Sequence, residues 1–173
     1  MGRKEVVLAG SGGQGLLLIG KILGEAAAIF EGKNAVQTTA YGVATRGGFS
    51  KSEVIISEEE IAFPEAMDPD YVVCLSPQAF EIYNGKIKED ALLIYDKDTI
   101  KCENQKYYGF SMTNAAVELK NIRILNMIAL GILVKLTGIV SLDSIVKSLE
   151  KNSPEQFKEQ NLRAFYKGFE MAP

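Results

Sequence analysis

The residues best suited to bind a ligand lie in two short glycine-rich stretches. The first reads Gly-Ser-Gly-Gly-Gln-Gly at residues 10–15 and fits the spacing G-x-G-x-x-G. Glycines at this spacing let backbone N–H groups approach a phosphate at the positive N-terminus of a helix. The second stretch, residues 41–48, contains an arginine whose guanidinium can hold a phosphate or carboxylate through two hydrogen bonds. The candidate binding residues are Gly12, Gly13, Gln14, Gly15, Tyr41, Arg46, Gly47 and Gly48.

Each stretch also has a purely structural interpretation. A dinucleotide site needs a carboxylate at the end of the second strand for the ribose hydroxyl, and the corresponding residues 38–40 are Thr-Thr-Ala. Glu31 stands at about the right distance in sequence but falls at the end of the predicted helix, and no Gly-Lys-Ser/Thr follows to make a P-loop. Two structural alternatives to a phosphate site therefore remain. The glycines can serve a tight turn packed against a neighbouring element, and Arg46 can form a simple ion pair with a nearby carboxylate.

Other catalytic groups are scarce in this chain of 173 residues. It contains no histidine, which excludes Ser-His and Cys-His nucleophile pairs and removes the most common general base. The two cysteines, Cys74 and Cys102, are too far apart in sequence to form a CxxC motif for zinc or an iron–sulfur cluster. We interpret them as free, inert thiols in a reducing compartment, and we expect no catalytic residue and no metal site in this chain.

Composition indicates one globular domain spanning residues 1–173, with 47% hydrophobic and 24% charged residues. A net charge of −3 argues against a nucleic acid partner, because no basic field would attract phosphates. The N-terminal residues lack the pattern of a signal peptide, and the most apolar stretch, residues 122–137, is too short and too polar at its edges to span a bilayer. We therefore expect a cytoplasmic protein without a membrane partner.

The chain alternates strand and helix patterns before a helical C-terminal portion. Short apolar runs predict strands over residues 5–9, 35–39, 71–75 and 91–95, with a further strand over 107–110. Residues 49–57 alternate with charges, which favours an antiparallel or edge strand. Helical spacing follows the first glycine stretch over residues 16–30. The predicted fold class is α/β, a single three-layer α/β/α domain with a mixed, mainly parallel sheet.

Several helix ends are also readable. Ser76 followed by Pro77, and Ser141, are predicted N-caps, and Ser-Pro-Glu-Gln at residues 153–156 fits a capping box. The predicted helix over residues 122–137 is apolar nearly all round, so it is either buried in its own core or covered by another chain. Asn126 within it needs a hydrogen-bonding partner if it is buried.

Taken together, the two glycine stretches resemble the gamma subunit of 2-oxoacid:ferredoxin oxidoreductases. The similar segments are residues 10–15, 37–42, 45–48, 52–57 and 126–131, and the segment around Asn161, so the resemblance runs essentially from end to end. The 2-oxoglutarate type is most similar, since pyruvate-type subunits tend to carry arginine in place of Ser11. The family often has Pro-Glu where this chain has Val43 and Ala44, which removes any carboxylate role from this loop.

The resemblance implies a division of labour. In this family, thiamine diphosphate and the 4Fe–4S clusters are bound by partner subunits, which decarboxylate the 2-oxoacid, transfer the acyl group to coenzyme A and reduce ferredoxin. This chain is then an accessory or assembly subunit near the coenzyme A or thiamine diphosphate region, inactive alone, with alpha and beta subunits as partners and a delta subunit where the complex has one. The alternatives are a subunit of an indolepyruvate, pyruvate or branched-chain 2-oxoacid oxidoreductase, and a free-standing nucleotide-binding module.

Overall fold

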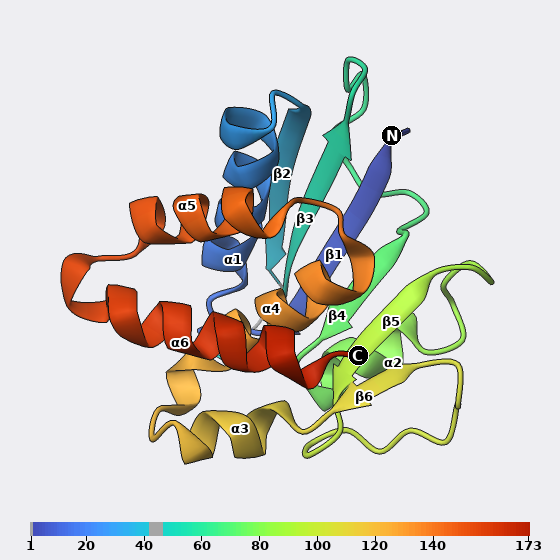
Figure 1. The fold of residues 1–173 in the computed structure, drawn as a ribbon. Coiled ribbons are helices and arrows are strands. Elements are labelled where there is room, and N and C mark those ends of the chain that lie inside the picture. The colour runs from blue at the N-terminus through green and yellow to red at the C-terminus, as the bar shows by residue number, and fades with distance from the viewer. Residues whose placement is uncertain (1, 42–46) are drawn as a thin grey trace.

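A computed structural model describes residues 2–41 and 47–173. Within these residues, six strands form one sheet in the order β2-β3-β1-β4-β5-β6 (Figure 1). β3 runs antiparallel to both of its neighbours, and the remaining pairs are parallel, so the predicted mixed, mainly parallel sheet is confirmed. The strands are β1 (Lys4–Ser11), β2 (Asn34–Tyr41), β3 (Phe49–Ser57), β4 (Tyr71–Cys74), β5 (Leu92–Asp96) and β6 (Tyr108–Phe110).

The charged alternation in β3 has a simple cause. Val54 and Ile56 face the helices on one side of the sheet, while Glu53 points to the other side and is buried there. The Glu53 carboxylate accepts hydrogen bonds from the Thr38 hydroxyl and the Ala66 N–H, and it pairs with Lys51. The prediction of an antiparallel strand is confirmed, whereas an edge position is wrong, because β3 lies between β2 and β1.

Helices cover both faces of the sheet, as predicted for three layers, but the layers are unequal. One face carries α1, α3, α4, α5 and α6 over the larger core, and the other carries α2 over a smaller one (Figure 1). The predicted helix over residues 16–30 is an α-helix that continues as a π-helical turn, η1. The helices are α1 (Leu16–Glu25), η1 (Ala26–Phe30), α2 (Pro77–Tyr83), α3 (Met112–Glu118), η2 (Ile122–Ile124), α4 (Leu125–Thr137), α5 (Leu142–Asn152) and α6 (Glu155–Met171).

The apolar helix α4 is buried by its own chain, so coverage by another chain is not needed. Every residue from 125 to 134 is buried, and α6 packs along α4 on the side away from the sheet (Figure 1). A Cβ atom at Gly131 would overlap the Phe165 carbonyl oxygen, and one at Gly168 would overlap the Ile128 carbonyl oxygen, so glycine is required at both places. No helix in the described ranges combines the length and hydropathy needed to cross a membrane.

Two of the three predicted N-terminal caps are confirmed, and α6 begins at Glu155, within the third predicted motif. The Ser76 hydroxyl accepts from the Ala79 N–H at the start of α2, and the Ser141 hydroxyl accepts from the Ser144 N–H at the start of α5. The predicted capping box at residues 153–156 is wrong. Ser153 instead follows the last residue of α5, and its hydroxyl accepts a hydrogen bond from the Asn161 side chain, which ties α5 to α6.

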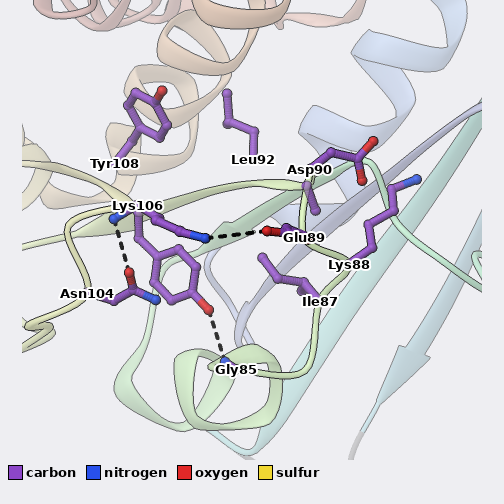
Figure 2. Close-up of a pocket in the computed structure, with 11 residues that line it drawn as sticks. Gly85, Ile87, Lys88, Glu89, Asp90, Leu92, Asn104, Lys106 and Tyr108 are labelled. Carbon is purple, nitrogen blue, oxygen red and sulfur yellow. Dashed lines mark hydrogen bonds and ion pairs between the residues drawn. The ribbon is translucent and has the colours of Figure 1, made fainter.

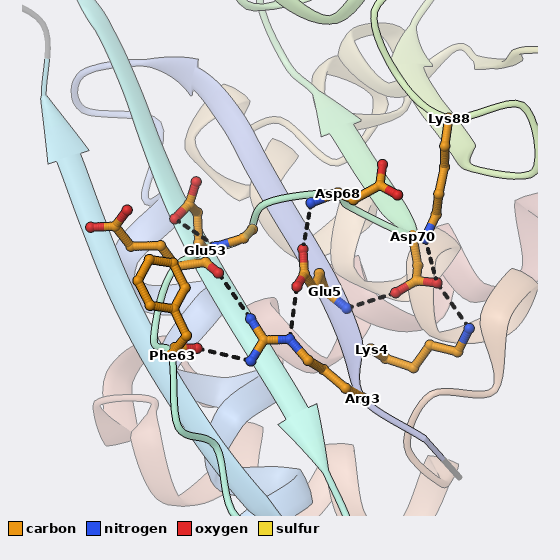
Figure 3. A network of polar contacts seen from close by, with 10 residues as sticks. Arg3, Lys4, Glu5, Glu53, Phe63, Asp68, Asp70 and Lys88 are labelled. Atoms are coloured by element: carbon orange, nitrogen blue, oxygen red, sulfur yellow. Dashed lines mark hydrogen bonds and ion pairs between the residues drawn. The ribbon is translucent and has the colours of Figure 1, made fainter.

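A polar network closes the end of the sheet where β1 and β4 begin (Figure 3). The Asp70 carboxylate accepts hydrogen bonds from the Glu5 N–H at 2.9 Å and from the ammonium groups of Lys4 at 2.9 Å and Lys88 at 3.1 Å. Beside it, the Glu5 carboxylate accepts from the Arg3 guanidinium at 2.8 Å. The network joins the N-terminal strand to the loop before β4, so it holds the two strands in register far from their carboxyl ends.

We predict that Asp70→Asn lowers stability at neutral pH and flattens its loss in acid. Burial alone would raise the pKa of the Asp70 carboxyl, but the hydrogen bonds from Glu5, Lys4 and Lys88 outweigh burial and hold this pKa below its usual value. A depressed pKa stabilises the fold above the unfolded value of about 3.9, and this contribution is lost as the pH falls through the folded pKa. Urea unfolding at several pH values should show a deficit of about 1–3 kcal/mol at pH 7 that shrinks in acid.

The matched control for this experiment is Asp143→Asn. Asp143 is exposed and pairs with Lys147 one turn along α5. An exposed pair of this kind contributes only about 0.5 kcal/mol. Equal pH profiles for the two variants would contradict the stabilising role of Asp70.

Candidate functional site

The strand order places a natural ligand site between the carboxyl ends of β1 and β4. These two strands are parallel neighbours, and the helix that follows β1 packs on one face of the sheet while the helix that follows β4 packs on the other. At such a reversal the connecting loops separate, which leaves a crevice outside the strand ends. The glycine loop at residues 12–15 forms one side of this crevice and Leu75 forms another.

The two glycine stretches lie against each other at this edge. The Gly12 N–H donates to the Gly48 carbonyl at 2.9 Å, and a Cβ atom at Gly12 would lie 3.8 Å from the Gly47 nitrogen. Gly13 has φ of +90° and Gly15 has φ of +72°, a region that side chains with a Cβ atom rarely adopt. The glycines therefore serve a tight turn and a close approach between loops, as their structural interpretation predicts.

Gln14 ties the loop to the neighbouring strand. Its side-chain oxygen accepts from the Ser11 N–H at 2.7 Å, and its side-chain nitrogen donates to the Leu75 carbonyl at 2.9 Å. One amide thus joins the carboxyl end of β1 to that of β4. Because the Ser11 and Gly12 N–H groups are already bonded within the protein, any phosphate must be bound by the part of the loop beyond them.

Asn126, in the first turn of α4, fixes the start of α1 through a hydrogen bond. Its side-chain nitrogen donates to the Gly15 carbonyl at 3.3 Å, and its side-chain oxygen accepts from the Met127 N–H at 2.9 Å. A Cβ atom at Gly15 would overlap the Asn126 side-chain nitrogen. The prediction that a buried Asn126 has a hydrogen-bonding partner is confirmed, and this partner is the Gly15 carbonyl of the glycine loop.

The crevice is a cavity of about 420 Å³, within the range of small-molecule sites. Arg123 from η2 adds a cation to its wall, and Thr99 and Thr113 add hydroxyl groups. α1 begins two residues after Gln14, and its first turn carries no acidic side chain, so the positive end of the helix is not neutralised. The lining residues are Gly13, Gln14, Leu75, Thr99, Thr113, Ile122, Arg123 and Leu125. This arrangement suits a ligand that carries both an anionic and an apolar part.

A buried carboxylate holds the hydroxyl side of the crevice. Asp96, at the end of β5, is fully buried and accepts hydrogen bonds from the Met112 and Thr113 N–H groups at the start of α3. It also accepts from the Thr99 hydroxyl at 3.2 Å and from the Thr113 hydroxyl. Since its acceptor positions are used in this way, Asp96 acts as a positioning residue for Thr99 and Thr113.

Six of the eight predicted binding residues lie at this edge of the sheet. Gly12, Gly13, Gln14 and Gly15 form the loop, and Gly48 lies against it together with Gly47. The backbone of Tyr41 ends β2, opposite Ser50. Arg46 lies outside the described residues, as do Val43 and Ala44. Glu31 is at the far end of the first helix, where its carboxylate accepts from the Ser141 N–H, so it cannot serve a ribose at the glycine loop.

Sequence reasoning missed Arg123, Thr99 and Thr113. No local pattern singles out these residues, because η2 and α3 reach the crevice only through the packing of the whole helical layer. Leu75 could have been found, since residues that follow adjacent parallel strands meet at the same edge of a sheet.

A second cavity lies at the opposite end of the sheet, where β5 and β6 begin (Figure 2). Its volume is about 350 Å³, and its charges are mixed, with Lys106 lying 3.8 Å from Glu89. The Tyr107 hydroxyl accepts from the Gly85 N–H at 3.0 Å. Opposite charges side by side select no single class of ligand, so this cavity is a weaker candidate than the crevice.

The thiols and carboxylates elsewhere show no reactive arrangement. Cys74 is buried at the end of β4, and burial raises the pKa of its thiol, which disfavours the nucleophilic thiolate. Within the described part of the chain, no three His, Cys, Asp or Glu side chains gather closely enough to hold a metal ion.

We predict that Gln14→Leu destabilises the protein by about 1–3 kcal/mol, because the Ser11 N–H and the Leu75 carbonyl both lose their partner. Chemical denaturation of the purified chain, followed by circular dichroism, measures the change. Gln105→Leu is the matched control, since Gln105 is exposed in a turn. Equal unfolding midpoints for the two variants would show that the Gln14 bridge contributes nothing.

Comparison with known proteins identifies the family. The family model for pyruvate ferredoxin/flavodoxin oxidoreductase matches residues 5–171. The chain is 44% identical to the 2-oxoglutarate synthase subunit KorC of Methanocaldococcus jannaschii, over 98% of this chain and 94% of that protein.

Two solved structures have the same fold. The gamma subunit of a keto/oxoacid ferredoxin oxidoreductase from Geobacter sulfurreducens is 39% identical, with a TM-score of 0.86 over 98% of both chains. A 2-oxoglutarate:ferredoxin oxidoreductase from Magnetococcus marinus, solved with 2-oxoglutarate, coenzyme A and succinyl-CoA bound, is 25% identical, with a TM-score of 0.87 over 99% of this chain and 31% of that one. The chain therefore belongs to the pyruvate ferredoxin/flavodoxin oxidoreductase family and is a subunit of an oxidoreductase complex.

Proposed function

We propose that this chain is the gamma-type subunit of a complex that oxidises 2-oxoglutarate. The complex releases carbon dioxide, transfers the succinyl group to coenzyme A and passes two electrons to ferredoxin. The observation that carries the proposal is the 44% identity to a 2-oxoglutarate synthase subunit over nearly the whole length of both proteins. Pyruvate and branched-chain 2-oxoacids are the competing substrates, because subunits of pyruvate and ketoisovalerate oxidoreductases are also related to this chain. They are less favoured, since those subunits are only 29–35% identical to it.

Within this proposal, the bond-breaking chemistry belongs to the alpha and beta subunits, with a delta subunit where the complex has one. Thiamine diphosphate supplies the electron sink for decarboxylation, and 4Fe–4S clusters carry the electrons, both on those partners. The chain has no histidine, and its two free cysteines stand apart, which supports the assignment of the cofactors elsewhere. Free thiols also support a reducing location such as the cytoplasm.

The crevice is the proposed contact with coenzyme A. Of the proposed residues Gly12, Gly13, Gln14, Gly15, Tyr41, Arg46, Gly47 and Gly48, the first four shape the loop, and Gly47 and Gly48 support it. The start of α1 and the Arg123 guanidinium supply positive charge for a phosphate group, while Leu75, Ile122 and Leu125 supply apolar surface. These groups bind and orient, and none of them acts as an acid, base or nucleophile.

Reconstitution tests the proposed reaction. Co-expression with the partner subunits should give reduction of ferredoxin or a viologen dye that depends on thiamine diphosphate, coenzyme A and 2-oxoglutarate, and the isolated chain should be inactive. Pyruvate, 2-oxoisovalerate and indolepyruvate serve as matched substrates in the same assay. A higher kcat/KM for one of them would overturn the substrate assignment, and full activity of a complex without this chain would overturn its role.

We predict that Arg123→Gln raises the KM for coenzyme A about tenfold. This factor corresponds to the binding free energy of one hydrogen bond from a charged donor. The KM for 2-oxoglutarate and the melting temperature should stay unchanged, because Arg123 is exposed at the crevice wall. Arg163→Gln, at an exposed position on α6, is the control. Equal coenzyme A kinetics for the two variants would remove Arg123 from the site.

A further inference from the structure

The two edges of the sheet differ in how they are protected. β6 has only three residues, and a short strand offers little for another chain to pair with. β2, at the other edge, has eight residues and pairs with β3 in unbroken register from Asn34 to Tyr41, without a bulge (Figure 1). Its sequence, Asn-Ala-Val-Gln-Thr-Thr-Ala-Tyr, contains no charged residue and no proline. β2 therefore lacks the devices that usually keep an edge strand from pairing.

A groove with an exposed helical stripe runs beside this edge. The groove has a volume of about 270 Å³ and lies between the first helix and β2, with Gly24, Ala28 and Ala35 among its lining residues. The stripe along α1 and η1 consists of Leu17, Lys21, Glu25 and Ile29, each four residues from the next. Leu17 and Ile29, at its two ends, are 51% and 55% exposed, although both are large and apolar. Two large apolar side chains are therefore exposed beside an open strand edge, where they are available to contact another chain.

We propose that two copies of this chain associate about a two-fold axis along the outer edge of β2. The two β2 strands then pair antiparallel and join the two sheets into one, and the two α1–η1 stripes lie side by side above the junction. This inference does not depend on the proposed reaction, since it rests on the edge and the stripe alone.

The stripe is complementary to itself when one copy is reversed. Its order is apolar, positive, negative, apolar, so an antiparallel copy sets Leu17 against Ile29 and Lys21 against Glu25 at both ends. Glu25 Oε2 is already held by Lys151 and Asn152, at 3.1 and 2.9 Å, whereas Oε1 lies 3.8 Å from its own Lys21. Oε1 is thus placed to take a second cation. The neutral β2 strand likewise opposes no like charges in an antiparallel pair.

The spacing of the elements agrees with this arrangement. Strands in a sheet lie about 4.8 Å apart, so the axis falls about 2.4 Å outside β2. The first helix packs over both β2 and β3. Because α1 packs more over β3 than over β2, it lies about 5–7 Å from the axis, so the two copies of α1 are about 10–14 Å apart and the long side chains of the two stripes can meet between them. Strand pairing and contact between the stripes can therefore form together.

Sedimentation velocity and light scattering on the full chain at micromolar concentrations test the proposal. The expected particle has twice the chain mass of 18.9 kDa. Lys21→Glu and Glu25→Lys should each weaken dimerisation about tenfold, because two symmetric attractions become repulsions. Mixing the two variants restores opposite charges at both contacts, so native mass spectrometry should show the mixed dimer. This rescue separates a broken interface from a damaged fold.

Lys147→Glu is the matched control, because Lys147 is as exposed as Lys21 and also pairs with an acid one turn away. It should leave the dimer intact, whereas Thr39→Lys, which places a charge on the open edge, should abolish it. Hydrogen exchange should show the β2 amides protected in the dimer. A chain that stays monomeric, or β2 amides protected only when the oxidoreductase partner subunits are added, would overturn the proposal.

Discussion

The burial of α4 is the constraint on which the candidate site depends. This helix lies between the sheet and α6, and a fully buried leucine, isoleucine or methionine contributes about 1.5–3 kcal/mol to stability. The close approach of α6 is possible only because Gly131 and Gly168 lack side chains. With α4 fixed, Asn126 at its first turn meets the Gly15 carbonyl and sets where α1 begins. The floor of the crevice is therefore positioned by the core rather than by the loops.

The architecture was largely predictable, because local patterns and burial agree. Runs of Val, Ile and Leu predict each central strand, and the charges of β3 indicate its antiparallel direction, whereas the buried partners of Glu53 have no signature in the sequence. The capping box failed for a non-local reason, since the Ser153 hydroxyl is taken by Asn161. The glycine loop was predictable as a feature, but the bridge from Gln14 to Leu75 spans 61 positions and has no signature in either segment. Arg123 reaches the crevice only through tertiary packing, so no spacing rule could have found it.

The described groups of the candidate site are held in place by hydrogen bonds within the protein. Its hydroxyls are oriented by Asp96, its loop is tied by Gln14, and its cation stands at the wall. In the proposed function, this site orients coenzyme A while the chemistry takes place on another chain.

The central place of β1 has a consequence for synthesis. β1 leaves the ribosome before both of its neighbours, β3 and β4, and β4 ends only at Cys74. The apolar residues Val6, Val7 and Leu8 have no strand on either side until β3 ends at Ser57, and they have none on the other side until β4 is made. The nascent chain must therefore carry an incompletely paired, aggregation-prone strand until β4 has been made, a period in which a chaperone that covers extended apolar segments has its greatest effect.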